Sequence, residues 1–236
     1  MYKQTRLGDD AQIYQPREKQ SEREKLREMN FQGKAAYIWE YYKIHIIVLV
    51  AVLALITYFI YGLLHPAAST QFYAAFVNNP INENVLEEYK TDFSGRLELN
   101  PKKEAVLFNT NFVFGEDDQN QYSMAMREAL ITYVSAKEID VIIAPESQFY
   151  AYSYNGFFSK LSDQLPTDIY SSLTDQFFMS DTTDETEKNV YGIYLTDTSL
   201  FKENSAGSEP YVLGIAGNSR HKENAIEFIR FLFDDK

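Results

Sequence analysis

The chain has 236 residues, contains no cysteine, and carries 22 Lys and Arg residues against 34 Asp and Glu residues, a formal net charge of −12. The lack of cysteine excludes disulfides, cysteine-based metal sites and a cysteine-linked lipid anchor. The excess of acidic residues lies after residue 43, and it disfavours binding of that part to nucleic acid or to anionic lipid headgroups.

Residues 1–43 form a basic tail with nine Lys and Arg residues and seven Asp and Glu residues. The first 20 residues are polar, which predicts disorder. Ser21 and Glu24 have the spacing of a capping box, so a short juxtamembrane helix is expected to begin there. Gly33 is expected to separate this helix from the next one, which would start near Lys34.

The longest apolar run extends over residues 44–64 and holds no Asp, Glu, Lys or Arg. About 20 apolar residues span the hydrocarbon core of a bilayer as a helix. A buried core helix is the alternative, but it would show a polar stripe. Trp39, Tyr41 and Tyr42 precede the run, as in the aromatic belt of membrane helices, and Pro66 follows it. The pattern predicts one transmembrane helix over 44–64.

Lys and Arg are distributed unequally about this run. Nine of them precede it, whereas residues 65–94 contain only Lys90. This asymmetry predicts a cytoplasmic N-terminus and an extracellular C-terminal domain, anchored in the cell membrane by a single pass. The long region before the run, and the lack of a small-x-small site after it, favour an uncleaved anchor over a signal peptide.

The remaining residues, 67–236, alternate between strand and helix patterns. Short apolar runs predict strands, and apolar residues three or four apart predict helices. The expected strands are 71–77, 105–114, 139–144, 190–196 and 211–216; the expected helices are 85–93, 122–134, 147–154, 168–178 and a last helix capped by Asn218 or Ser219. This order predicts an α/β domain with a doubly wound sheet, in which the run 139–144 is a strand of a parallel sheet.

Two stretches resemble the extracellular solute-binding proteins of bacterial ABC importers, which have the type II periplasmic-binding fold. In residues 126–166 the matching positions are Asp140, Val141, Gly156, Phe157 and Leu161. In residues 212–232 they are Asn218, Ser219, Ala225, Phe228, Phe231 and Leu232.

The resemblance implies one lobe of such a protein, because only about 50 residues separate the two stretches. The arrangement of tail, span and lobe also looks like that of uncharacterised membrane proteins of low-GC Gram-positive bacteria.

No catalytic constellation is evident in the sequence. The three histidines are His45 and His65, which flank the span, and His221, which is expected to be solvated in the first turn of the last helix. The acidic runs 116–118 and 181–187 lack the spacing of a calcium-binding EF-hand loop. There is no phosphate-binding or dinucleotide-binding glycine motif. We therefore expect neither an enzyme nor a metal or cofactor site.

Candidate ligand-binding residues lie where the predicted strands end, because ligands of open α/β sheets bind beyond the carboxyl ends of the strands. These candidates are Asn78, Asn79, Pro145, Glu146, Ser147 and Phe149. Phe149 begins an aromatic stretch that extends to Phe158. This stretch could line a ligand groove, and the alternative is core packing with surface tyrosines.

The sequence is compatible with three functions. The favoured one is a binding or accessory domain that docks on a transporter or on another membrane or envelope protein. The second is a receptor for a small molecule or peptide. The third is a hydrolase that uses carboxylates, which the lack of histidine and cysteine chemistry disfavours.

Overall fold

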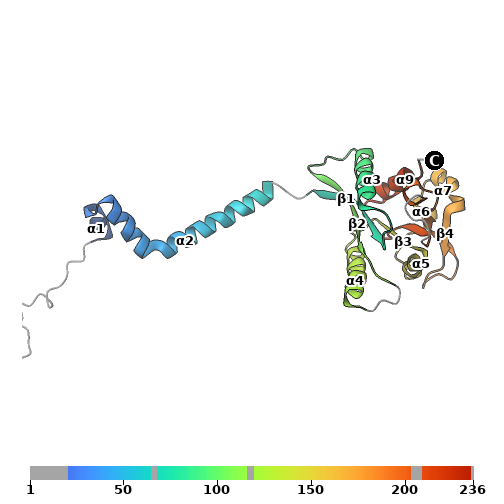
Figure 1. Ribbon diagram of the computed structural model, residues 1–236, viewed down its shortest axis with the longest axis horizontal. Helices are drawn as coiled ribbons and strands as arrows, with labels where there is room; N and C mark the ends of the chain where they lie inside the picture. The colour runs from blue at the N-terminus through green and yellow to red at the C-terminus, as the bar shows by residue number, and fades with distance from the viewer. Residues whose placement is uncertain (1–20, 65–67, 116–119, 203–208, 235–236) are drawn as a thin grey trace, which may run out of the picture. The chain divides into compact units, whose positions relative to one another are not determined.

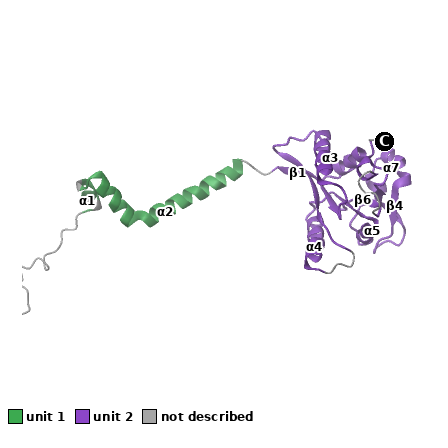
Figure 2. Cartoon of the chain, viewed as in Figure 1, with its two compact units in different colours: residues 1–66 green, residues 67–236 purple. Residues whose placement is uncertain are grey.

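The computed structural model describes residues 21–64, 68–115, 120–202 and 209–234. It divides into two compact units, residues 1–66 and residues 67–236 (Figure 2). The expected disorder of residues 1–20, the helix stop at Pro66 and the acidic run 116–118 lie outside the described residues.

The first unit contains two helices, α1 (Glu22–Glu28) and α2 (Phe31–Leu64). The predicted capping box is confirmed: the Ser21 N–H donates to Glu24 Oε2 at 3.0 Å, and the Glu24 N–H donates to Ser21 Oγ at 3.3 Å. The predicted break at Gly33 is wrong, because the chain leaves helical geometry at Met29. Gly33 lies in the first turn of α2, where its N–H donates to Asn30 Oδ1 at 2.8 Å.

Helix α2 is long and apolar enough to cross a membrane. None of its residues is buried within the protein, which distinguishes it from the core helix of a soluble domain. Its 34 residues measure about 50 Å at 1.5 Å per residue, more than the roughly 30 Å of a bilayer core. The apolar run 44–64 is therefore the part of the helix that matches the hydrocarbon thickness.

The second unit is built on a six-stranded mixed sheet (Figure 1). The strands are β1 (Ser69–Val77), β2 (Glu104–Phe112), β3 (Val141–Pro145), β4 (Phe177–Ser180), β5 (Asn189–Tyr194) and β6 (Tyr211–Ile215). Their order is β2-β1-β3-β6-β5-β4. Strand β1 is parallel to β2 and β3, whereas β6 is antiparallel to both β3 and β5, and β4 is antiparallel to β5.

The expectation of a doubly wound α/β sheet is met in part. Helices cover both faces, but the sheet is mixed rather than parallel. Strand β3 is buried along its whole length, as predicted, yet only its β1 side is parallel. The reason is that β6 enters between β3 and β5 in the opposite direction. An apolar run indicates burial on both faces and does not show the direction of the neighbouring strands.

One face of the sheet packs against α3 (Glu83–Arg96), α6 (Leu161–Gln164), α7 (Thr167–Ser172), α8 (Ser199–Lys202) and α9 (Lys222–Phe233). Its centre is a group of aromatic rings: Phe72 of β1 lies 5.1 Å from Phe93 of α3 and 4.8 Å from Phe228 of α9, between ring centroids. These rings join the first strand to the last helix.

The other face packs against α4 (Gln121–Ser135) and α5 (Glu146–Tyr154). Leu130 and Val134 of α4 and Phe149 of α5 are buried there. The predicted apolar stripe of α4 is only partly correct, because Tyr122 is exposed and its neighbour Ser123 is buried.

Two further expectations are wrong. The helix expected over 168–178 ends at Ser172 and is followed by a short 3-10 turn (Thr174–Gln176), after which Phe177 and Phe178 begin β4. Pairing with β5 overrides the local helical pattern. The last helix is capped neither by Asn218 nor by Ser219, because His221 occupies the N-cap position and makes no side-chain cap bond.

Candidate functional site

The carboxyl ends of β1, β2, β3 and β5 meet at one edge of the sheet, together with the amino end of β6. This follows from the pairing, in which Pro145 of β3 lies opposite Tyr211 of β6, and Tyr194 of β5 lies opposite Val212. The predicted residues Asn78, Asn79, Pro145, Glu146 and Ser147 all lie at this edge. The two asparagines follow β1, Pro145 ends β3, and Glu146 and Ser147 follow β3.

Asn78 fixes the segment that follows β2. Its side chain pairs with the backbone of Phe114 in both directions: Nδ2 donates to the Phe114 carbonyl at 2.8 Å, and the Phe114 N–H donates to Oδ1 at 2.9 Å. Asn78 has φ of 50°, a left-handed conformation that asparagine tolerates better than most residues. Its carbonyl accepts a hydrogen bond from the Tyr211 hydroxyl. Asn78 is therefore a structural link between three segments.

The other candidates at this edge also have partners within the chain. Glu146 Oε1 accepts a hydrogen bond from the Tyr194 hydroxyl at 2.9 Å, and the Ser147 hydroxyl donates to Glu209 Oε2 at 3.0 Å. Asn79 bonds to the backbone of Ile81. Burial, with the hydrogen bond to Glu146 as a second cause, raises the pKa of Tyr194 to about 12, so this phenol is neutral at physiological pH.

Phe149 lies in the core and not at the surface of the site. Its side chain is fully buried and stacks on Phe158 with 4.3 Å between ring centroids and 7° between ring planes. The aromatic stretch divides, because Tyr150 and Tyr154 are exposed whereas Phe149 and Phe158 are buried. Tyr152 lies between these groups and lines a pocket.

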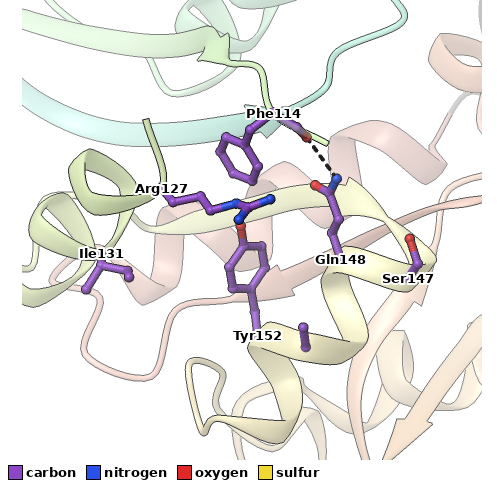
Figure 3. A pocket seen from close by; sticks show the side chains of 7 residues that line it. Phe114, Arg127, Ile131, Ser147, Gln148 and Tyr152 are labelled. Carbon is purple, nitrogen blue, oxygen red and sulfur yellow. Dashed lines mark hydrogen bonds between the residues drawn. The ribbon is translucent and has the colours of Figure 1, made fainter. Parts of the chain in front are cut away.

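This pocket has a volume of about 370 Å³ and lies between α4, α5 and the end of β2 (Figure 3). Arg127 and Ile131 are four residues apart on α4, and Gln148 and Tyr152 are four residues apart on α5, so each pair lies on one face of its helix. Its lining residues are Phe114, Arg127, Ile131, Ser147, Gln148, Ala151 and Tyr152.

Arg127 and Gln148 contact the segment of Phe114 and Gly115 that forms one wall of the pocket. The Arg127 guanidinium lies 5.3 Å from the centroid of the Phe114 ring and donates to the carbonyl of Gly115. Gln148 Nε2 donates to the carbonyl of Phe114 at 3.1 Å. Burial raises the pKa of Tyr152, and the positive charge of Arg127 opposes this shift in part, so the phenol remains neutral.

Among the lining residues, only Ser147 was predicted from the sequence as a ligand-binding residue, and the wall formed by α4 was not predicted. Arg127, Ile131 and Gln148 belong to two helices whose packing on one sheet face cannot be read from spacing alone. The available signal was the repeated i, i+4 pairing of an apolar or aromatic residue with a polar one on each helix.

At the other edge of the sheet, Ser219 and the partly exposed His221 bind the buried carboxylate of Asp140. Asp140 is fully buried, and its carboxylate accepts hydrogen bonds from the Tyr73 N–H at 2.9 Å and from the Ser219 hydroxyl at 2.6 Å. His221 Nδ1 lies 3.2 Å from Asp140 Oδ2. The prediction that His221 is simply solvated is therefore wrong. Among the described residues, no group of three or more His, Asp and Glu side chains could hold a metal ion.

Comparison with models of known protein families gives no match. Comparison with curated proteins likewise gives no match.

Proposed function

We propose that the chain is a single-pass membrane protein whose outer domain binds another membrane or envelope protein outside the cell. Helix α2 supports the membrane anchor, because it is apolar and has no buried residue. The Lys and Arg residues before the apolar run support a cytoplasmic N-terminus. The resemblance to one lobe of a solute-binding protein remains part of this proposal and implies docking on a transporter.

The observation that carries the proposal is the pocket between α4 and α5 and the apolar surface beside it. Met124 and Ile131 of α4 are exposed by 60% and 48%, and both lie on the helix face that carries Arg127. Exposed apolar side chains around a concave site are typical of protein interaction surfaces. The same pocket would suit the alternative function, a receptor for a small molecule or peptide.

The proposal is tested by purifying the full-length protein from its own membranes in a mild detergent and identifying co-purified proteins by mass spectrometry. Ile131→Asp should abolish recovery of a stoichiometric membrane partner. Met179→Asp is the matched control, because Met179 is exposed by 52% on β4 and does not line the pocket. If both variants recover the partner equally well, the partner does not bind at the pocket. If the wild-type protein recovers no partner, the receptor function is favoured.

A further inference from the structure

Strand β2 is an end strand of the sheet, so its outer side pairs with no other strand among the described residues. An open strand edge is a template for pairing with another chain, and proteins usually protect it with charged residues, proline or a β-bulge. Residues 105–114 contain no charged residue, no proline and no glycine. A register shift places one extra residue on β2 between residues 109 and 112. The first half of the edge is therefore regular and unprotected.

The hydrogen bond at the start of β2 shows which of its residues face the open side. The Ser69 N–H of β1 donates to the Lys103 carbonyl at 2.7 Å, so the backbone of Lys103 faces β1. Backbone direction alternates along a strand, and Val106 and Phe108 therefore direct their N–H and C=O groups away from β1. Among the described residues, these outward groups form no hydrogen bond.

The outward N–H groups on either side of this pair are already used within the chain. The Glu104 N–H donates to the Asn100 carbonyl at 2.8 Å, and the Asn111 N–H donates to Asn109 Oδ1 at 2.9 Å. The part of the edge that can pair is thus confined to two residues, which are two positions apart.

We propose that two copies of this chain join along β2, with the two strands antiparallel and Leu107 of one copy opposite Leu107 of the other. In this register Val106 lies opposite Phe108 of the second copy, and their outward N–H and C=O groups bond to one another. A register centred on Val106 would place Phe108 opposite Glu104, whose N–H is already used. A register centred on Phe108 would place Val106 opposite Thr110, where the extra residue interrupts the strand.

The side chains favour a second copy as the occupant of this edge. Leu107 is 41% exposed although it is apolar, and in the proposed register it would be covered by the same residue of the other copy. No charged residue lies between residues 105 and 109, so two acidic domains would meet here without opposing like charges. The two-fold axis is perpendicular to the sheet, so both copies face the same direction, as two proteins anchored in one membrane must.

Disulfide trapping tests the contact, because the chain has no native cysteine. In a non-hydrogen-bonded antiparallel pair the Cα atoms lie about 4.5 Å apart, which suits a disulfide. Mild oxidation of the full-length protein in its own membranes should convert Leu107→Cys to a covalent dimer, measured on a non-reducing gel. Met179→Cys is the matched control, because Met179 is 52% exposed on β4 at the opposite end of the strand order. Equal dimer formation by the two variants would overturn the proposal.

Two further cysteine variants test the register. Position 105 should lie opposite position 109 of the other copy, so Ala105→Cys and Asn109→Cys should each give little dimer alone and a mixed dimer when they are expressed together. More dimer from Ala105→Cys alone than from Leu107→Cys would contradict the proposed register. A disulfide between Leu107→Cys and a different protein, identified by mass spectrometry, would show that a foreign strand occupies the edge.

A substitution that introduces charge tests the contact without oxidation. Leu107→Lys would place two like charges opposite each other, and it should abolish energy transfer between fluorescent proteins fused to the N-termini of two copies. Met179→Lys should leave the transfer unchanged, and equal melting temperatures of the two variants would show that both are folded. Unchanged transfer with Leu107→Lys would contradict the proposal. The edge contains no residue that lines the pocket, so this result is independent of the docking function.

Discussion

The ring of Phe149 occupies space on the sheet that two glycines leave open. A Cβ atom at Gly192 would lie 2.5 Å from Val212 Cγ1 and 2.7 Å from Phe149 Cζ, and a Cβ atom at Gly214 would lie 2.7 Å from both Phe149 and Phe158. The glycines therefore set how closely α5 approaches β5 and β6. Because α5 also carries Gln148 and Tyr152, this close packing positions one wall of the pocket.

We predict that Gly214→Ala lowers the free energy of unfolding by about 1–3 kcal/mol, because the added methyl group must displace buried rings. Gly95→Ala is the control: nothing lies within 4 Å of an added Cβ in α3, so helix propensity should stabilise the protein by up to about 1 kcal/mol. Denaturant unfolding followed by circular dichroism measures both changes. If Gly214→Ala leaves the free energy of unfolding unchanged, Phe149 can move away from the added methyl group at no cost.

Burial of tyrosine side chains makes the stability of the folded protein depend on pH in the alkaline range. Burial raises the pKa of Tyr211 to about 12, whereas an unfolded tyrosine ionises near pH 10. Between these values the unfolded state loses its proton first, so stability should fall as the pH rises from about 10 to about 12. Tyr211→Phe should make this fall shallower, and Tyr122→Phe, at an exposed position, should not. Unfolding midpoints measured between pH 9 and pH 12 test the difference.

At the scale of elements, Asp140 joins three segments at the edge opposite the pocket. Its carboxylate binds the backbone N–H of Tyr73 in β1, and it binds both Ser219 and His221 at the start of α9. One buried carboxylate therefore sets where the last helix begins. This explains why Ser219 does not cap α9, since its hydroxyl is directed to Asp140 instead.

We predict that Asp140→Asn costs about 1–3 kcal/mol of stability, because the amide has one acceptor oxygen and brings a donor among the N–H groups of Tyr73 and His221. Asp92→Asn, at an exposed position in α3, should change stability by no more than about 0.5 kcal/mol. Thermal unfolding of both variants tests this. Similar values for the two would show that the network is structurally dispensable.

The contact between α3 and α9 is electrostatic at its surface and apolar beneath. Arg96 binds Glu227 and Asp234, each at 2.6 Å, but its side chain is 31% exposed. Exposed ion pairs contribute little, so Arg96→Ala should cost less than about 1 kcal/mol, and the loss should shrink in high salt. Phe93→Ala, in the core below, should cost about 3–5 kcal/mol. Denaturation at low and high salt separates the two contributions.

At the scale of the whole molecule, the proposed topology can be tested because the chain has no native cysteine. Ser21→Cys and Asp184→Cys both introduce exposed thiols, one before the proposed span and one in the outer domain. A membrane-impermeant maleimide added to intact cells should label only Asp184→Cys, and permeabilised cells should show labelling of both. Labelling of Ser21→Cys in intact cells would reverse the orientation.

The sequence by itself determined the apolar helix, the capping box before it and most strands of the outer domain, because these depend on local apolar runs and short-range spacing. It also placed Asn78, Glu146 and Ser147 at one edge, since strand ends are readable from the chain. The tertiary structure alone decided that β6 runs antiparallel between β3 and β5, and that Phe177 and Phe178 form a strand. It also decided that Phe149 lies in the core and that Gln148 faces a pocket. These features depend on which segments distant in the sequence pack together, and side-chain periodicity carries no information about that choice.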